Sequence, residues 1–171
     1  ELARAGAQVA ITASYQASLP GLAAIGFGRV EAEQALRRSV DLARTAAADG
    51  VNEATAPGSG PRWVATSVGP YGAALADGSE YRGQYGLTRE ELADFHRERL
   101  AVLVASKPDL LAIETIPDVD EALALADALA DFPDVPAWMS FSAADGTTTC
   151  AGQPIAEAAA VAASIPSVVA M

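Results

Sequence analysis

The sequence predicts a parallel α/β fold, in which helices cover a sheet of short strands. Apolar runs of strand length alternate with longer stretches of helical periodicity along the whole chain. The runs are almost continuously apolar, which is typical of strands covered on both faces of a parallel sheet. The first four end at polar residues or turns rather than at hairpin signals such as Asn-Gly, so consecutive strands are not expected to be antiparallel neighbours.

The expected elements alternate between strand and helix up to a fifth strand. A first helix is expected over Arg29–Ala48 and ends at Gly50, because glycine is common just after a helix. A last helix is expected from Pro154, whose fixed φ suits the first helical position, to Ser164. The expected strands are Val9–Ser14, Trp63–Val68, Leu110–Thr115, Trp138–Ser142 and Val168–Met171.

Two further helices begin at capping signals. Thr88 with Glu91 is a capping box that opens a helix up to Ser106. Asp118 with Glu121 repeats this pattern at the start of the next helix. Acidic side chains in a first turn suit the positive end of the helix dipole, so we interpret them as helix-stabilising residues rather than as catalytic pairs.

The composition excludes several classes of function. The 171 residues carry 22 Asp and Glu against 11 Lys and Arg, a formal net charge of −11. Binding to nucleic acid or to an anionic membrane surface is not expected, because both need clustered positive charge. No stretch of about 18 apolar residues lacks charges, so no membrane span is expected. Lys107 is the only lysine and alanine is abundant, which we interpret as the composition of a cytoplasmic bacterial protein.

Features outside the expected strands also bear on function. Cys150 is the only cysteine, which excludes a metal site built from several thiolates of this chain, and we interpret it as a bystander. His96 lies inside a predicted helix, and we interpret it as a helix-surface or packing residue rather than as a catalyst. Gly58–Arg62 and Pro70–Leu87 are expected to be irregular. The second is rich in glycine and tyrosine, and we interpret it as an ordered lid or pocket wall.

Two architectures fit this order of elements. Five strands with four helices suit an open doubly wound sheet in length, whereas a closed (β/α)8 barrel usually needs about 250 residues. Length alone favours the open sheet. Both ends of the chain look cut, however. It begins at Glu1, in what we interpret as the last turn of a helix that ends at Gly6, and it stops at Met171 inside an apolar run.

Candidate site residues lie at the expected carboxyl ends of the strands, where parallel α/β folds bind their substrates. Glu114 ends an apolar run, where a charge is costly unless it is paired. It is an acceptor for a cationic group, a general base, or one half of a structural ion pair with an arginine. Tyr15 either presents its hydroxyl to a substrate or packs against the next helix. The turn Gly69-Pro70-Tyr71 either offers backbone N–H groups to an anion or only redirects the chain.

Six segments, taken together, resemble the homocysteine S-methyltransferases in order and spacing. They are Ile11–Ser18, Ser67–Ala73, Asp77–Gly83, Phe95–Arg97, Leu110–Pro117 and Asp145–Thr147. That family folds as a (β/α)8 TIM barrel, so the resemblance implies a barrel instead of an open sheet. It also implies that residues 1–171 are one partial homocysteine-binding barrel domain, truncated at both ends and spanning about strands 2 to 6.

The resemblance also implies a reaction. The family moves a methyl group from a sulfonium donor, S-methylmethionine or S-adenosylmethionine, to homocysteine and produces methionine. Zinc (Zn) lowers the pKa of the homocysteine thiol, so that a thiolate faces the donor methyl group. The resemblance places the three cysteine ligands of that zinc outside this chain, and Cys150 matches none of them. We therefore assign no catalytic or metal-binding residue here and expect the chain alone to be inactive.

Residue by residue, the resemblance implies five substrate-binding assignments. Glu114 matches the glutamate that receives the homocysteine ammonium group, and Tyr15 matches a tyrosine of the homocysteine pocket. Gly69, Pro70 and Tyr71 match the loop after the family's third strand, on the donor side. Two alternatives stay open. One is a betaine- or selenocysteine-type methyltransferase of the same superfamily, and the other is a non-catalytic small-molecule-binding domain with an open five-strand sheet.

Overall fold

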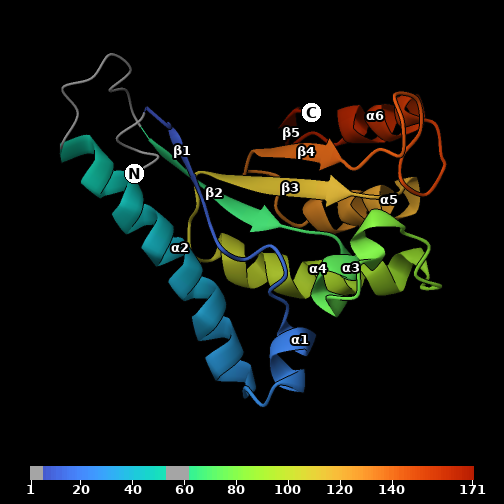
Figure 1. Cartoon of the computed structure of the whole chain (residues 1–171). Helices are drawn as coiled ribbons and strands as arrows, with labels where there is room; N and C mark the ends of the chain where they lie inside the picture. Colours follow the sequence, from blue (N-terminus) through green and yellow to red (C-terminus); the bar gives the residue numbers. More distant parts are fainter. Residues whose placement is uncertain (1–5, 53–61) are drawn as a thin grey trace.

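The computed structural model describes residues 6–52 and 62–171, which form a five-stranded sheet with helices beside it (Figure 1). The strands are β1 (Val9–Ile11), β2 (Trp63–Val68), β3 (Leu110–Ile116), β4 (Ala137–Phe141) and β5 (Val168–Ala170). The helices are α1 (Leu19–Ala24), α2 (Arg29–Asn52), α3 (Tyr71–Leu75), the short 3-10 helix η1 (Ser79–Tyr81), α4 (Arg89–Val104), α5 (Val119–Leu129) and α6 (Ile155–Ser164). The predicted α/β alternation is confirmed.

The strands pair in the order β1-β2-β3-β4-β5, and every pair is parallel. The expectation that consecutive strands are not antiparallel neighbours is confirmed. An open doubly wound sheet reverses its strand order at a switch point. The strands that the structure describes show no such reversal, so the strand order argues against the doubly wound architecture that chain length favours.

The helices share one hydrophobic core with one face of the sheet. Figure 1 shows α2, α4, α5 and α6 gathered beside the strands. Burying one large aliphatic side chain contributes roughly 1.5–3 kcal/mol, so this cluster is what holds the helices on the sheet. Its buried members include Val64, Val68, Leu111, Ile113 and Met139 from the strands, and Leu36, Val40, Leu100, Leu103, Leu125 and Ala162 from the helices.

The opposite face of the sheet carries large apolar side chains that are exposed. Strand side chains alternate between the two faces. The neighbour Val64 belongs to the core, and the neighbours Ala10 and Val168 pack against it. Ile11, Trp63 and Val169 therefore point the other way, with 50%, 41% and 71% of their surface exposed. Exposed apolar side chains gathered on one face mark a surface that another part of a protein covers.

The structure corrects several predicted boundaries. The helix predicted to end before Gly50 continues to Asn52, because one glycine costs a helix only about 1 kcal/mol. β1 stops at Ile11, since the residues after it turn their hydroxyl groups to β2. Pro154 is the N-cap of α6 rather than its first helical residue. The short helices α1, α3 and η1 lie in connections where the sequence shows no helical periodicity.

Two expectations fall largely on residues that the structure does not describe. The helix end expected before Gly6, and the irregular segment Gly58–Arg62 apart from its last residue, lie outside the described residues. Within residues 6–52 and 62–171, no helix combines the length and the apolar character needed to cross a membrane.

The two predicted capping boxes form differently. In α4, the Glu91 N–H donates to Thr88 Oγ1 at 3.2 Å and the Thr88 N–H donates to Glu91 Oε2 at 2.8 Å, as predicted. In α5, the Glu121 N–H donates to Asp118 Oδ1 at 2.7 Å. The Glu121 carboxylate does not return to Asp118, because it is buried and accepts hydrogen bonds elsewhere. The second half of that capping box is therefore wrong.

Candidate functional site

Buried hydroxyl groups join the ends of β1 and β2. The hydroxyl oxygens of Thr12 and Ser14 lie 2.6 Å apart. The Ser67 N–H donates to Thr12 Oγ1 at 2.9 Å, and Ser14 Oγ donates to the Ser67 carbonyl at 2.7 Å. The segment after β1 is therefore fixed against β2 without any charged group. Ser14 and Ser67 lie at or near the ends of two expected strands, but the sequence does not predict that they bond to each other.

Glu114 lies at the carboxyl end of β3 beside this network. Ser67 pairs with Ala112, so Glu114, two residues later, faces the same side of the sheet as Ser67. The Ser67 hydroxyl donates a hydrogen bond to the Glu114 carboxylate. Among the described residues, no Lys, Arg or His lies at salt-bridge distance from Glu114. The described part of the chain thus gives no support to the structural ion pair. The two other interpretations of Glu114, an acceptor for a cationic group and a general base, stay predictions.

The backbone is strained directly after Glu114. Thr115 has a φ of 67°, a left-handed conformation that β-branched residues rarely adopt. The pairing of β3 with β4 shifts its register between Ile113 and Ile116, so the strained residue lies at an irregularity of the strand. Such strain costs on the order of 1–3 kcal/mol and collects at functional sites, where bulges redirect side chains. The strained residue, Thr115, directly follows Glu114 at the carboxyl end of β3.

Tyr15 packs its ring on the backbone of Gly69. A Cβ atom at residue 69 would lie 2.6 Å from the Tyr15 carbonyl oxygen and 2.7 Å from two carbons of its ring, so only glycine fits there. Burial raises the pKa of the Tyr15 hydroxyl, and the nearby carboxyl groups of Glu80 and Glu114 add to that rise. The structure therefore brings Tyr15, Gly69 and Glu114, three of the predicted site residues, to one edge of the sheet.

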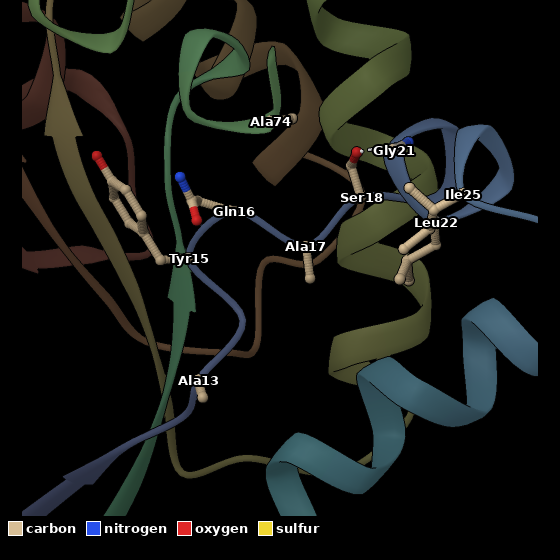
Figure 2. Close-up of a pocket in the computed structure, with 9 residues that line it drawn as sticks. All are labelled: Ala13, Tyr15, Gln16, Ala17, Ser18, Gly21, Leu22, Ile25 and Ala74. Carbon is tan, nitrogen blue, oxygen red and sulfur yellow. Dashed lines mark hydrogen bonds between the residues drawn. The ribbon is translucent and has the colours of Figure 1, made fainter. Parts of the chain in front are cut away.

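A pocket of about 450 Å³ lies beside Tyr15, between the segment after β1 and helix α1 (Figure 2). Figure 2 shows the Tyr15 ring extending away from Leu22 and Ile25, toward the strands. The lining contains no charged side chain and consists of Ala13, Tyr15, Gln16, Ala17, Ser18, Gly21, Leu22, Ile25 and Ala74. We place the candidate site on the other side of Tyr15, with Glu114, because the strand ends and the carboxylate found there are the features that the sequence predicts for a site.

Glu80, in η1, is a carboxylate at this edge that sequence reasoning missed. It is 8% exposed, and its Oε2 atom has no hydrogen-bond partner among the described residues. η1 packs against β3, and the Glu80 backbone lies so close to Gly72 that a Cβ atom there would overlap its nitrogen. A buried carboxylate oxygen without a hydrogen-bond partner is costly unless a ligand supplies a donor or the opposite charge. The available signal was an acidic residue inside a glycine- and tyrosine-rich connection after a strand.

The turn after β2 is held by groups of the protein itself. The Tyr71 N–H donates to Glu121 Oε1 at 2.5 Å, and Pro70 has no N–H. The Tyr71 ring packs on Tyr85 and Phe95, with ring centroids 5.2 Å and 4.9 Å apart. The interpretation of this turn as an anion-binding loop is therefore wrong for both of these residues. Their assignment to substrate binding stays a prediction.

The Pro70–Leu87 connection is ordered, as the sequence predicts. It contains α3 and η1, and the Gln84 N–H donates to Asp118 Oδ2 at 2.9 Å. The Gln84 side chain donates to the Ala151 carbonyl at 3.2 Å. The connection is therefore anchored at the start of α5 and places Glu80 beside Tyr15.

His96 is a packing histidine, and its interpretation as a helix-surface residue is wrong. It is completely buried, and its Nε2 atom lies 2.8 Å from Glu121 Oε1. Glu121, which the sequence suggests only as a first-turn acidic residue, is completely buried as well. The local sequence pattern does not predict the burial of His96 or of Glu121, because both are buried by the packing of α4 against α5.

The buried His96 predicts a pH dependence of stability. Burial lowers the pKa of His96 below its ordinary value of 6.5. Below pH 6.5 the unfolded chain binds a proton that the folded protein does not, so the free energy of unfolding falls as the pH falls. From pH 6.5 to about 5.5, the full-length wild type should lose up to about 1 kcal/mol more than His96→Gln in denaturant titrations. Equal losses in both proteins would contradict this expectation.

The described residues do not fit a zinc ion on their own. Cys150 is the only cysteine of the sequence and is half-buried. In the ranges 6–52 and 62–171, no three His, Cys, Asp or Glu side chains gather where they could hold a metal ion. Protein zinc sites use at least three such ligands.

Comparison with known proteins decides the family. The family profile of homocysteine S-methyltransferase matches residues 1–171. The chain belongs to the homocysteine S-methyltransferase family. The resemblance found in the sequence is confirmed.

Curated homocysteine S-methyltransferases share close to half of the aligned residues with this chain. Homocysteine S-methyltransferase 4 of Zea mays is 50% identical over 171 residues, which cover 96% of this chain and 50% of the relative. Homocysteine S-methyltransferase of Escherichia coli (strain K12) is 46% identical over 168 residues, which cover 98% of this chain and 54% of the relative. The chain thus spans about half the length of the curated relatives it matches.

The fold is that of solved homocysteine methyltransferase structures. The oxidized form of the homocysteine methyltransferase MmuM from Escherichia coli matches with a TM-score of 0.91 and 46% identity, over 98% of this chain and 56% of that chain. The metallated form of MmuM matches with a TM-score of 0.91 and 46% identity, over 97% of this chain and 57% of that chain.

Proposed function

We propose that the protein containing this chain is a homocysteine S-methyltransferase, which moves a methyl group from S-methylmethionine or S-adenosylmethionine to homocysteine and forms methionine. The observation that carries the proposal is the Glu114 carboxylate, to which Ser67 donates a hydrogen bond and which has no cationic partner among the described residues. The ammonium group of an amino acid supplies that positive charge. Membership of the family supports homocysteine as the amino acid.

We assign the substrates to the edge of the sheet as follows. Glu114 receives the homocysteine ammonium group, and Tyr15 forms a wall of the homocysteine pocket. The turn Gly69–Tyr71 lies on the donor side. Glu80 adds a second carboxylate near the Tyr15 hydroxyl. Because an ammonium group and a sulfonium group are both positive, two carboxylates without described counter-ions favour such substrates over anionic ones.

The proposed reaction is a displacement at a methyl carbon. The homocysteine thiol loses its proton, and a sulfur lone pair forms the new S–CH3 bond. The S–CH3 bond of the donor breaks, and its electron pair stays on the donor sulfur, which becomes a neutral thioether. Holding the two substrates in line contributes much of the acceleration of such a step, so the orientation of Glu114 and Tyr15 matters for the rate.

We propose that zinc activates the thiol through cysteine ligands outside this chain. The metallated form of Escherichia coli MmuM supports a metal in a relative, although the residues described here contribute no metal-binding cluster. It follows that residues 1–171 alone are inactive. We place the whole protein in the cytoplasm, which the arginine- and alanine-rich composition supports.

We propose that the sheet is an arc of a (β/α)8 barrel, about strands 2 to 6. The consecutive parallel order of the strands and the gathering of the helices on one side support this. Ile11, Trp63 and Val169 are exposed on the other side. In a closed barrel that side is the interior, which is filled with side chains.

Residues 1–171 expressed alone are expected to self-associate. β1 and β5 lie at the two edges of the sheet, and an unpaired strand edge templates pairing with another chain. The exposed apolar face is a second surface through which two chains can associate. Static light scattering should show species heavier than one chain. A monodisperse monomer would contradict this expectation.

Methyl transfer by the full-length protein tests the proposed function. Homocysteine is offered with S-methylmethionine, S-adenosylmethionine or betaine, and the methionine formed is quantified. We expect turnover with a sulfonium donor and none with betaine. Turnover with betaine, or a preference for selenocysteine over homocysteine, would favour the corresponding other methyltransferases. Homocysteine binding without turnover would favour a non-catalytic binding domain.

A further inference from the structure

Three polar side chains form a completely enclosed chain of hydrogen bonds between α4 and α5. Arg99, His96 and Glu121 are each 1% exposed or less. Arg99 Nη2 lies 2.9 Å from His96 Nδ1, and His96 Nε2 lies 2.8 Å from Glu121 Oε1. We call these three residues the buried triad. Apolar side chains of similar volume often stabilise a protein equally well or better, so packing alone does not account for charged side chains at this position.

The contacts assign the proton of His96. Arginine has only donors, so His96 Nδ1 must accept from Arg99, and the ring proton lies on Nε2, which donates to the Glu121 carboxylate. Burial lowers the pKa of His96, and it lowers the pKa of Arg99 only to about 10, so the guanidinium stays charged near neutral pH. A neutral imidazole therefore lies between one positive and one negative group.

Both ends of the buried triad hold the backbone of the same turn. Arg99 Nη2 also donates to the Gly69 carbonyl at 2.6 Å, while Glu121 Oε1 accepts from the Tyr71 N–H at 2.5 Å. The residue between them is a proline, which cannot donate. The turn after β2 is thus held by hydrogen bonds on both sides of its proline, from Arg99 in α4 and from Glu121 in α5.

The Gly69–Tyr71 turn also supports Tyr15. The Tyr15 ring and carbonyl lie against Gly69 so closely that no side chain fits between them. A shift of the Gly69 backbone therefore moves the surface on which Tyr15 rests. We propose that the buried triad is a positioning device, which sets the Gly69–Tyr71 turn and through it the place of Tyr15 at the substrate edge. The effect of the buried triad on kinetics rests on the proposed function, whereas its hydrogen bonds to the turn do not.

Arg99→Lys in the full-length protein tests this proposal. Arg99 reaches both acceptors with Nη2, at the end of its guanidinium, whereas a lysine side chain ends one bond earlier, so its ammonium group does not reach both of them. Hydrogen–deuterium exchange of a peptide covering residues 69–73 should become about tenfold faster, the change expected when one hydrogen bond to a charged group is lost. The KM for homocysteine should rise about tenfold with a smaller change in kcat, because Tyr15 is displaced while the reacting groups are retained.

Arg97→Lys is the matched control. Arg97 lies on the same helix but is partly exposed and pairs with Asp94 and Asp131, so neither exchange at the turn nor KM should change. Unchanged exchange in Arg99→Lys would contradict the claim that the buried triad holds the turn. Faster exchange with an unchanged KM would overturn the role for Tyr15. If the wild type transfers no methyl group, the proposed function fails, while the exchange experiment still decides whether the triad holds the turn.

A measurement on the wild type covers the case in which Arg99→Lys does not fold. Nitrogen-15 NMR of the full-length protein at pH 7 reports the protonation of His96 directly. We expect a neutral ring with its proton on Nε2. An imidazolium, or a neutral ring with its proton on Nδ1, would break the hydrogen-bond chain and overturn the proposal.

Discussion

Glu114→Gln in the full-length protein should weaken homocysteine binding by about a hundredfold. Glutamine keeps the size of the side chain and an acceptor for the Ser67 hydroxyl but removes the charge that pairs with the ammonium group. Losing a hydrogen bond between charged groups costs about 1.5–3 kcal/mol, which corresponds to roughly a 10- to 150-fold loss of affinity. Isothermal titration with homocysteine measures the effect.

Glu90→Gln is the matched control for this substitution. Glu90 is an exposed residue in the first turn of α4, on the surface rather than at the sheet edge. The Glu90→Gln substitution removes the same charge from the protein and should leave the affinity for homocysteine unchanged. An equal loss in both variants would indicate a general effect of net charge. An unchanged affinity in Glu114→Gln would remove Glu114 from the ammonium site.

Gly69→Ala should lower kcat/KM for methyl transfer by about a hundredfold, the loss that a displacement of about 1 Å near a reacting centre produces. The added methyl group would lie 2.6 Å from the Tyr15 carbonyl oxygen and 2.7 Å from its ring, so Tyr15 must move. The φ of Gly69 is not in the left-handed region, so alanine suits the backbone and the effect is steric. Steady-state kinetics of the full-length protein measure it.

Gly146→Ala controls for the glycine substitution. A Cβ atom at Gly146 would meet no heavy atom within 4 Å, and its φ is not in the left-handed region either. Its kinetics and thermal midpoint should match those of the wild type. Wild-type kinetics in Gly69→Ala would show that the contact between Gly69 and Tyr15 does not hold the site.

The helix starts could be predicted because capping signals are local, but their burial could not. Thr88 with Glu91 and Asp118 with Glu121 have the same spacing in the sequence. The first pair lies at the surface and forms the complete capping box. In the second, Glu121 bonds to a residue 50 positions earlier in the chain, a contact that no local pattern encodes. Tertiary packing thus decides which of two signals with the same spacing becomes part of a buried network.

The candidate site shows the same division. Glu114 could be predicted because a charge at the end of an apolar strand is visible in the sequence itself. Glu80 could not, because its burial arises where η1 packs on Gly72 and against β3. Likewise, the closeness of Tyr15 to Gly69 depends on how the segment after β1 folds over β2. The strand order, which argues against a doubly wound sheet, also appears only in the assembled structure.

A crystal structure of the full-length protein with bound homocysteine tests most directly whether this edge of the sheet is the substrate site. We predict that the homocysteine nitrogen lies within about 3 Å of a Glu114 carboxylate oxygen, the distance of a charge-assisted hydrogen bond. The Tyr15 ring should remain on Gly69 and form one wall of the pocket. Homocysteine bound away from this edge, with Glu114 paired to an arginine or lysine of the protein, would contradict the assignment.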